Sequence, residues 1–170
     1  WKEYDMIDTL ESPNTTFGNG HTNMVADFNS DGRMDMVVAV LNVGEAAVKN
    51  YSYGGVVLLT NTGEGIFTPE FIGKKAFTHA HNIGDLDDDG DVDIIYHQLG
   101  EKNITCAYND GKANFTIKSC LRTPIDTIHG GVQNIWGFRI ADYDNDGFND
   151  VLVIASHGGT EVSFFEGQHH

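Results

Sequence analysis

The sequence predicts an all-β protein assembled from repeated units of four antiparallel strands. One nine-residue acidic loop occurs three times, at spacings of 58 and 57 residues. Each copy is followed by a short apolar run rich in β-branched residues, which is typical of a buried strand. A turn and a strand that begins near an aromatic residue follow in the first two units. A period near 57 residues with four strands per unit predicts blades of the β-propeller type, about three of them in this chain.

The acidic loops span residues 27–35, 85–93 and 142–150. Side chains with oxygen atoms occupy positions 1, 3, 5 and 9, and a backbone carbonyl is expected at position 7. Calcium takes about six to eight oxygen ligands, and glycine at position 6 permits the sharp turn. We therefore predict about three Ca²⁺ ions, with these ligands: Asp27, Asn29, Asp31, Arg33 and Asp35; Asp85, Asp87, Asp89, Asp91 and Asp93; Asp142, Asp144, Asp146, Phe148 and Asp150.

The loops differ from EF-hand loops, which begin in the same way. An EF-hand carries a bidentate Glu at position 12 and continues into a helix. Here position 12 is Val38, Tyr96 or Val153, inside the apolar run. The metal loop is therefore expected to join two strands.

The other strands follow from superimposing the three copies. A strand enters each loop, over 23–26, 82–84 and 138–141, and another leaves it, over 36–40, 94–97 and 151–155. A third strand, over 56–60 or 104–108, runs into an Asn-x-Gly turn, where glycine tolerates positive φ. The fourth begins at 66–68 or 114–116.

This combination of Asp-rich loop, apolar strand and Asn-x-Gly-x-x-Phe-Thr resembles the FG-GAP/VCBS repeat family over nearly the whole chain. The family includes the head of the integrin α subunit. The resemblance implies a β-propeller with calcium in the loop between the first two strands of each blade. It implies no single activity, because the family includes adhesion receptors, lectins and accessory domains of extracellular enzymes.

Composition narrows the class of partner. The formal net charge is −15 and no basic stripe is present, so neither nucleic acid nor anionic lipid is an expected partner. No apolar run approaches the roughly 20 residues of a membrane span, and a chain that opens on Trp1 is expected to be processed or trimmed. Calcium modules of this kind operate at millimolar calcium, which predicts a secreted or cell-surface protein. Four N-glycosylation sequons support this setting: Asn14, Asn50, Asn103 and Asn114.

Cys106 and Cys120 leave two alternatives open. A disulfide would fit an oxidising compartment, since the two residues flank the same turn. A turn centred near Asp110, however, would place Phe115 opposite Cys106 and leave Cys120 about four residues too far along. The alternative is two small buried hydrophobic side chains.

We expect one repeat domain over 1–170, with repeats at about 12–77, 78–121 and 134–167. Propellers typically have about four to eight blades, so three repeats need completion. A predicted strand at 3–10 could complete the third repeat of the same chain or of a neighbouring copy, or blades could be missing.

Catalysis is not expected. His79 and His81 alternate on one predicted strand, and His21 takes the place of His79 in the preceding repeat, so repeat equivalence spreads the histidines over different blades. No hydrolase, zinc-protease or phosphate-binding motif occurs. The acidic loops and the Asn-x-Gly turns should share one end of the blades. Variable loops at the other end are the expected ligand-binding surface, with Tyr51, Tyr53 and His129 as candidates.

The predicted function is therefore an extracellular, calcium-stabilised module for adhesion or for binding a glycan or protein. Two alternatives remain open: a structural protein that assembles with copies of itself by terminal strand exchange, and part of a secreted carbohydrate-active enzyme.

Overall fold

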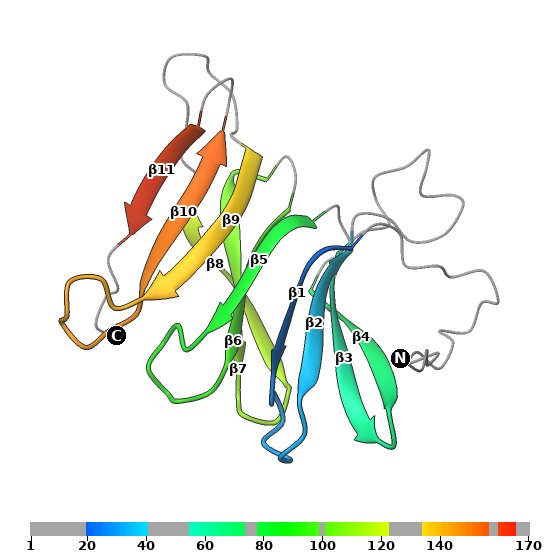
Figure 1. Ribbon diagram of the computed structural model, residues 1–170. Coiled ribbons are helices and arrows are strands. Elements are labelled where there is room, and N and C mark those ends of the chain that lie inside the picture. Colours follow the sequence, from blue (N-terminus) through cyan, green and yellow to red (C-terminus); the bar gives the residue numbers. More distant parts are fainter. Residues whose placement is uncertain are drawn as a thin grey trace, which may run out of the picture.

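The computed structural model describes residues 20–40, 55–73, 78–98, 101–122, 134–156 and 160–165. These residues form three antiparallel sheets, which we call blades 1, 2 and 3 (Figure 1). Blade 1 contains β1 (Gly20–Ala26), β2 (Asp35–Val40), β3 (Gly55–Gly63) and β4 (Ile66–Ile72); blade 2 contains β5 (Thr78–Gly84), β6 (Asp93–Gln98), β7 (Asn103–Asn109) and β8 (Phe115–Arg122); blade 3 contains β9 (Asn134–Ala141), β10 (Asp150–Ser156) and β11 (Thr160–Phe165). The predicted all-β fold of propeller-type blades is confirmed.

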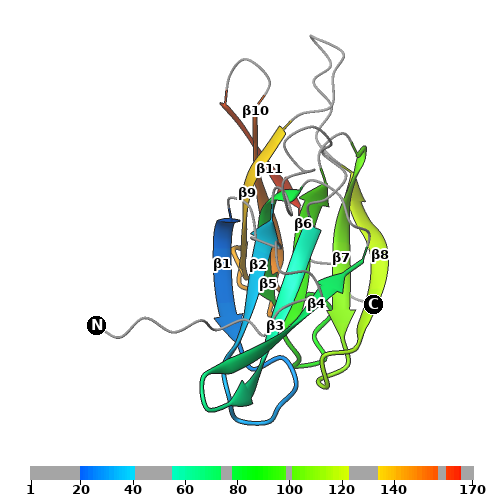
Figure 2. The same cartoon turned by 90° about the vertical axis from the view of Figure 1, so that its right-hand side faces the viewer.

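The three blades stand side by side with their first strands adjacent. β5 contacts both β1 and β9, so these strands form the inner edge of the array (Figure 1). In the view turned by 90°, the strands of the three blades run roughly along one common direction (Figure 2). The described residues do not close a ring, and residues 3–10, predicted to complete blade 3, lie outside them. None of the described residues belongs to a helix with the length and hydropathy of a membrane span.

Two apolar clusters fill the spaces between neighbouring blades. Val37 and Leu58 of blade 1 pack with Ile94 and Tyr96 of blade 2. Another cluster joins blade 2 to blade 3. Because blade 2 is covered on both faces, all six residues of β6 are buried. This explains why the apolar run after the second acidic loop is continuous rather than alternating.

The β7–β8 turn differs from the prediction. Cys106 pairs with Lys118, whereas a shorter turn would have placed Phe115 opposite it. Gly111 and Ala113 both adopt positive φ, 71° and 62°, and together they lengthen the turn. Alanine rarely adopts this conformation, so residue preferences do not predict the longer turn.

This register brings the two cysteines together. The pairing of β7 with β8 is also irregular between Ile104 and Thr105, beside Cys106. Cys106 and Cys120 form a disulfide, with their Cα atoms 5.6 Å apart. The bridge joins the third and fourth strands of blade 2.

Candidate metal centre

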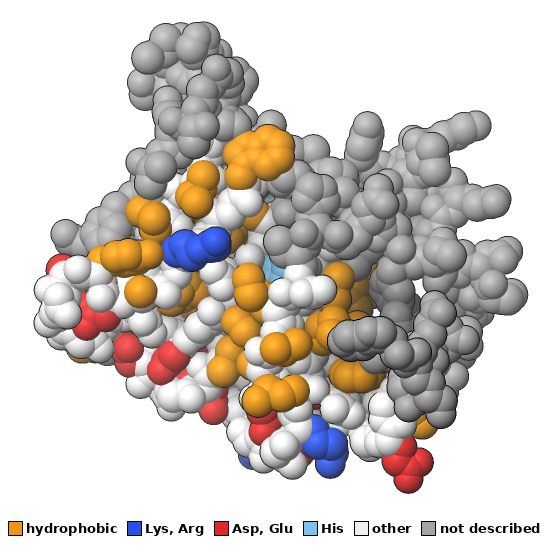
Figure 3. Space-filling model, viewed as in Figure 1, with side chains coloured by type: hydrophobic (Ala, Val, Ile, Leu, Met, Phe, Trp, Pro, Cys, Tyr) orange, Lys and Arg blue, Asp and Glu red, His pale blue; other side chains and the backbone are white. Residues whose placement is uncertain are grey.

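The three acidic loops lie at one end of the blades and share one backbone conformation. They connect β1 to β2, β5 to β6 and β9 to β10, and in Figure 3 acidic side chains follow this edge. Positions 4 and 6 have positive φ in every loop: Ser30, Asp88 and Asn145 at 57°, 60° and 61°, and Gly32, Gly90 and Gly147 at 83°, 90° and 96°. Glycine at position 6 was recognised from the sequence. Position 4 was not, although Ser, Asp and Asn suit it, since Asp and Asn tolerate the left-handed region better than most residues.

Carboxylates at positions 1, 3 and 5 converge in two loops. Asp85, Asp87 and Asp89 each offer an oxygen atom, and these atoms lie within 4.8 Å of one another. Asp142, Asp144 and Asp146 of the third loop form an equivalent group. The pKa of Asp87 is raised, first by desolvation and then by the charges of Asp89 and Asp85. Such crowding of like charges is relieved by a bound cation.

The second loop passes a stricter test of its fit to calcium. One carboxylate oxygen of Asp85, Oδ2, accepts a hydrogen bond from the Gly90 N–H at 3.0 Å. The other, Oδ1, is buried and has no hydrogen-bond partner. A buried acceptor without a donor is costly unless something else binds it. Hard oxygen donors of this kind are what Ca²⁺ prefers, so the residues present fit the ion.

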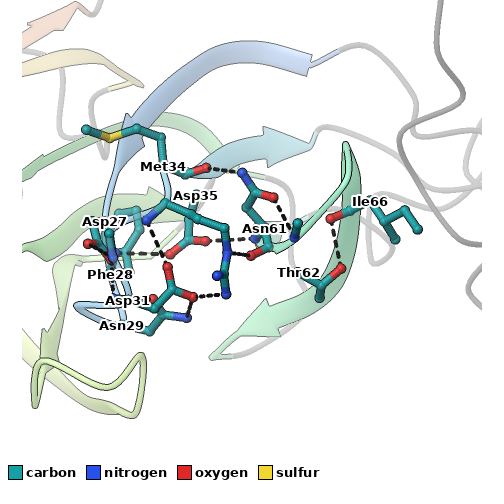
Figure 4. Close-up of polar contacts among 12 residues, drawn as sticks. Asp27, Phe28, Asn29, Asp31, Met34, Asp35, Asn61, Thr62 and Ile66 are labelled. Carbon is teal, nitrogen blue, oxygen red and sulfur yellow. Dashed lines mark hydrogen bonds and ion pairs between the residues drawn. The ribbon is translucent and has the colours of Figure 1, made fainter.

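Position 9 has a structural role that the sequence did not reveal. Asp35 is completely buried. Its Oδ2 accepts a hydrogen bond from the Phe28 N–H at 3.1 Å, and its Oδ1 accepts one from the Asn61 N–H at 2.8 Å (Figure 4). The carboxylate thus ties position 2 of the loop to the end of β3. We call this arrangement the position-9 clamp.

The clamp recurs in the other loops. Asp93 accepts hydrogen bonds from the N–H groups of Leu86 and Asn109, both at 2.8 Å. Burial raises the pKa of Asp93 to about 6, although these two backbone hydrogen bonds oppose the rise. Asp150, also buried, accepts a hydrogen bond from the Tyr143 N–H at 2.9 Å.

The first loop differs from the other two in its charges. Position 3 is Asn29, and the Arg33 guanidinium at position 7 forms an ion pair with Asp31. Arg33 Nε also donates a hydrogen bond to the Asn61 carbonyl at 2.8 Å. This loop therefore has one fewer carboxylate among positions 1, 3 and 5, and a cationic side chain of its own.

The asparagines of the two Asn-x-Gly turns also bind the acidic loops, a role that the sequence alone did not predict. The side-chain amide of Asn61 donates a hydrogen bond to the Met34 carbonyl at 3.2 Å. That of Asn109 donates to the Val92 carbonyl at 3.2 Å and, across the blade boundary, to the Phe28 carbonyl at 2.8 Å. The feature of the sequence that could have indicated this role is that Asn61 and Asn109 occupy the same place in the turn motif. The loops and turns do share one end of the blades, as predicted.

Other predicted sites are only partly described. The following lie outside the described residues: Tyr51, Tyr53 and His129 of the ligand surface, and the sequons at Asn14 and Asn50. Asn103 and Asn114 are exposed, as glycan attachment requires. Among the described residues, no histidine belongs to a group of three possible metal ligands. His81 is buried and its pKa is lowered to about 4, chiefly by desolvation.

Comparison with known proteins gives a family and a fold. The model of the FG-GAP-like repeat matches the chain twice, over residues 27–96 and 85–153. Among solved structures, the chain is similar to an Agrocybe aegerita lectin that specifically recognises non-reducing terminal N-acetylglucosamine, with a TM-score of 0.50 and 20% identity. The match covers 88% of this chain and 39% of the lectin chain, so this chain spans well under half of its length. At this identity the likeness shows a shared fold. No curated protein matches the chain.

Proposed function

This chain belongs to the FG-GAP-like repeat family, and we propose that it is a calcium-stabilised propeller module that binds a glycan or protein ligand outside the cell. One observation carries the calcium part of the proposal. In the second loop three carboxylates converge and the buried Oδ1 of Asp85 has no hydrogen-bond donor. A divalent cation would supply the missing partner and offset the repulsion among the carboxylates.

Within this proposal the ions brace the blades. Positions 1, 3, 5 and the carbonyl at position 7 would hold calcium, while the position-9 clamp fixes the loop on its blade. The second and third loops should bind more tightly than the first, in which Asn29 and Arg33 reduce the negative charge. Binding would then stabilise the folded state by mass action.

The ligand would bind at the opposite end of the blades, on the loops that contain Tyr51, Tyr53 and His129. Loops on a rigid scaffold commonly carry binding residues, and tyrosine offers both an apolar ring and a hydroxyl. The lectin with a similar fold makes a glycan the first ligand class to try. The disulfide, the exposed sequons and the proposed calcium sites all favour an extracellular setting. We propose binding without turnover.

Two measurements test the two halves separately. Calorimetric titration of the chelator-treated chain should detect Ca²⁺ binding, and urea unfolding should show added stability in calcium. Equal stability in calcium and in chelator would refute the metal half.

A glycan array that includes N-acetylglucosamine-terminated glycans tests the ligand half. Tyr51→Ala and Tyr53→Ala should weaken capture while leaving unfolding unchanged. Lys112→Ala, an exposed change at the metal end, is the control and should capture normally. Unaltered capture by both tyrosine variants would exclude this ligand surface.

A further inference from the structure

A groove opens between the outer strands of blades 1 and 2, which are β4 and β8. Its volume is about 350 Å³. This lies within the range of about 300–1,000 Å³ that is typical of sites for small ligands. One wall is the end of β4 with the residue that follows it, and the other is the β7–β8 turn with the start of β8. The lining includes the following residues: Glu70, Phe71 and Gly73 of blade 1; Asn114, Phe115 and Ile117 of blade 2.

The groove depends on the glycine that follows β4. Gly73 has φ of +72°, and a Cβ at this residue would collide with the Tyr96 hydroxyl and lie 3.8 Å from Ile117 Cγ2. The rest of the Tyr96 side chain is buried in the cluster that blades 1 and 2 share. Its hydroxyl therefore lies beside two residues of the groove lining.

Much of the remaining lining is apolar and partly open to solvent. Phe71 and Phe115 are half-buried, and Ile117 is 41% exposed. Phe115 also packs against the shared cluster, where its ring lies 6.1 Å from that of Phe28. The groove is thus the outer mouth of the contact between the two blades. An occupant would remove apolar surface from water at this boundary.

Asn114 brings an N-glycosylation sequon to the groove wall. Asn114 is exposed, and Thr116 completes the sequon. The backbone N–H of Asn114 donates a hydrogen bond to Asp110 Oδ1 at 3.2 Å, and its Nδ2 donates one to Asp110 Oδ2 at 2.9 Å. The Asp110 N–H in turn donates to the Asn114 carbonyl at 3.2 Å. These hydrogen bonds fix both the backbone and the side chain of Asn114, so a group attached to Nδ2 would leave it in a defined direction.

We propose that Asn114 carries an N-linked glycan whose first sugar packs in this groove and covers the boundary between blades 1 and 2. In the transfer, Asn114 Nδ2 forms a bond to C1 of the sugar, and the bond between C1 and the diphosphate of a lipid-linked oligosaccharide donor breaks. One amide proton passes to the transferring enzyme, and the other N–H remains for the hydrogen bond to Asp110. The proposal rests on the extracellular setting of the proposed function, but on neither its calcium sites nor its ligand surface.

A glycan attached at Asn114 is the occupant that this chain itself specifies. Its attachment point is part of the groove wall, so its effective concentration in the groove exceeds that of a free molecule. An N-acetylglucosamine unit has C–H groups that pack on aromatic rings and hydroxyl groups that form hydrogen bonds. Phe71 and Phe115 supply the rings, while the Glu70 carboxylate and the Tyr96 hydroxyl supply polar partners. The other exposed sequon among the described residues, at Asn103, lies opposite Arg122 at the start of β7 and outside the groove lining.

Production of the chain in the secretory pathway of a eukaryotic cell tests the attachment. Peptide mass spectrometry of the folded chain, recovered from cells or medium, should find a glycan on Asn114. Nuclear Overhauser contacts should then join the acetyl methyl group of the first sugar to the side chains of Phe115 and Ile117. An unmodified Asn114 would overturn the proposal, and so would a glycan that lacks these contacts.

Thermal unfolding tests whether the glycan stabilises the boundary. Thr116→Ala removes the sequon but keeps Asn114 and its hydrogen bonds, whereas Thr116→Ser keeps the sequon and is the matched control. From the glycosylating cell, Thr116→Ala should unfold about 2–4 °C below Thr116→Ser, because the groove is uncovered. The same two variants made in bacteria, without glycan, should unfold at one temperature.

A second sequon separates this groove from a general effect of glycans. Asn103→Gln removes the sequon outside the groove and should leave the unfolding temperature unchanged. Equal unfolding temperatures of glycosylated Thr116→Ala and Thr116→Ser would overturn the proposal, as would an equal loss in Asn103→Gln. Calcium titration of the bacterial chain needs no glycan, so failure of this proposal is distinguishable from failure of the proposed calcium sites.

Discussion

Removing the carboxylate of a position-9 clamp should destabilise the fold whether or not calcium is bound. Asp35→Ala leaves two backbone N–H groups, those of Phe28 and Asn61, without the acceptor that they have at 3.1 and 2.8 Å. Asp35 is 0% exposed, so water cannot readily replace it. Each buried donor left unsatisfied costs about 1–3 kcal/mol, which gives a loss of about 2–6 kcal/mol. Asp35→Asn keeps one acceptor oxygen and should lose about half as much.

The control is Asp31→Ala, four positions earlier in the same loop. Asp31 is more exposed, and its partner Arg33 is also at the surface. An exposed ion pair contributes about 0–1 kcal/mol, so this variant should lose little stability in chelator. In calcium it should lose more, because a proposed ligand is gone. Urea unfolding of both variants, with calcium and with chelator, separates the clamp from the metal site. If Asp35→Ala loses no more than Asp31→Ala in chelator, the clamp does not stabilise the loop as argued.

Three further predictions follow from single features of the structure. Burial lowers the pKa of His81 to about 4 from 6.5, so the unfolded state binds more protons than the folded state between these pH values. The free energy of unfolding should therefore fall by about 3 kcal/mol as pH drops from about 6.5 to 4. Acid unfolding of His81→Gln should lack this component. Gly73→Ala should lose about 1–3 kcal/mol, since φ is +72° and the new Cβ would collide with the Tyr96 hydroxyl; Gly65→Ala, with φ of +79° and open space, should lose less in thermal unfolding. Reduction of the disulfide, which closes a separation of 14 residues, should remove about 3 kcal/mol, measured by urea unfolding with and without reductant.

The repeated loops made the blades predictable, since three copies in register fix where the strands must start. They also identified positions 1, 3 and 5, which converge as oxygen ligands should. Position 9 looked the same in sequence, because an aspartate carries no sign of which groups its oxygens accept. One of the donors to Asp35, the Asn61 N–H, lies 26 residues away. Only the folded arrangement of the loop and the turn reveals that contact.

The disulfide between Cys106 and Cys120 could not be predicted for a different reason, which is the local irregularity of its own hairpin. Its separation was judged from an ideal hairpin, and the hairpin is not ideal. Ala113 adopts a left-handed conformation that alanine rarely takes, and the strand pairing shifts beside Thr105. Each irregularity is small, but together they move Cys120 into reach of Cys106. Residue preferences describe the common case, so they could not predict two exceptions in one hairpin.

The clamps also connect one acidic loop to the next, which gives the acidic repeat a role in assembling the blades. Asp35 holds the N–H of Phe28, and the Phe28 carbonyl accepts the side-chain amide of Asn109 in the next blade. The N–H of Asn109 is in turn held by Asp93, which also holds the N–H of Leu86 in the second loop. A continuous series of hydrogen bonds therefore runs from one loop through the blade boundary to the next loop. Since a single blade has no neighbour to complete this series, the acidic loop can position its residues fully only within an array.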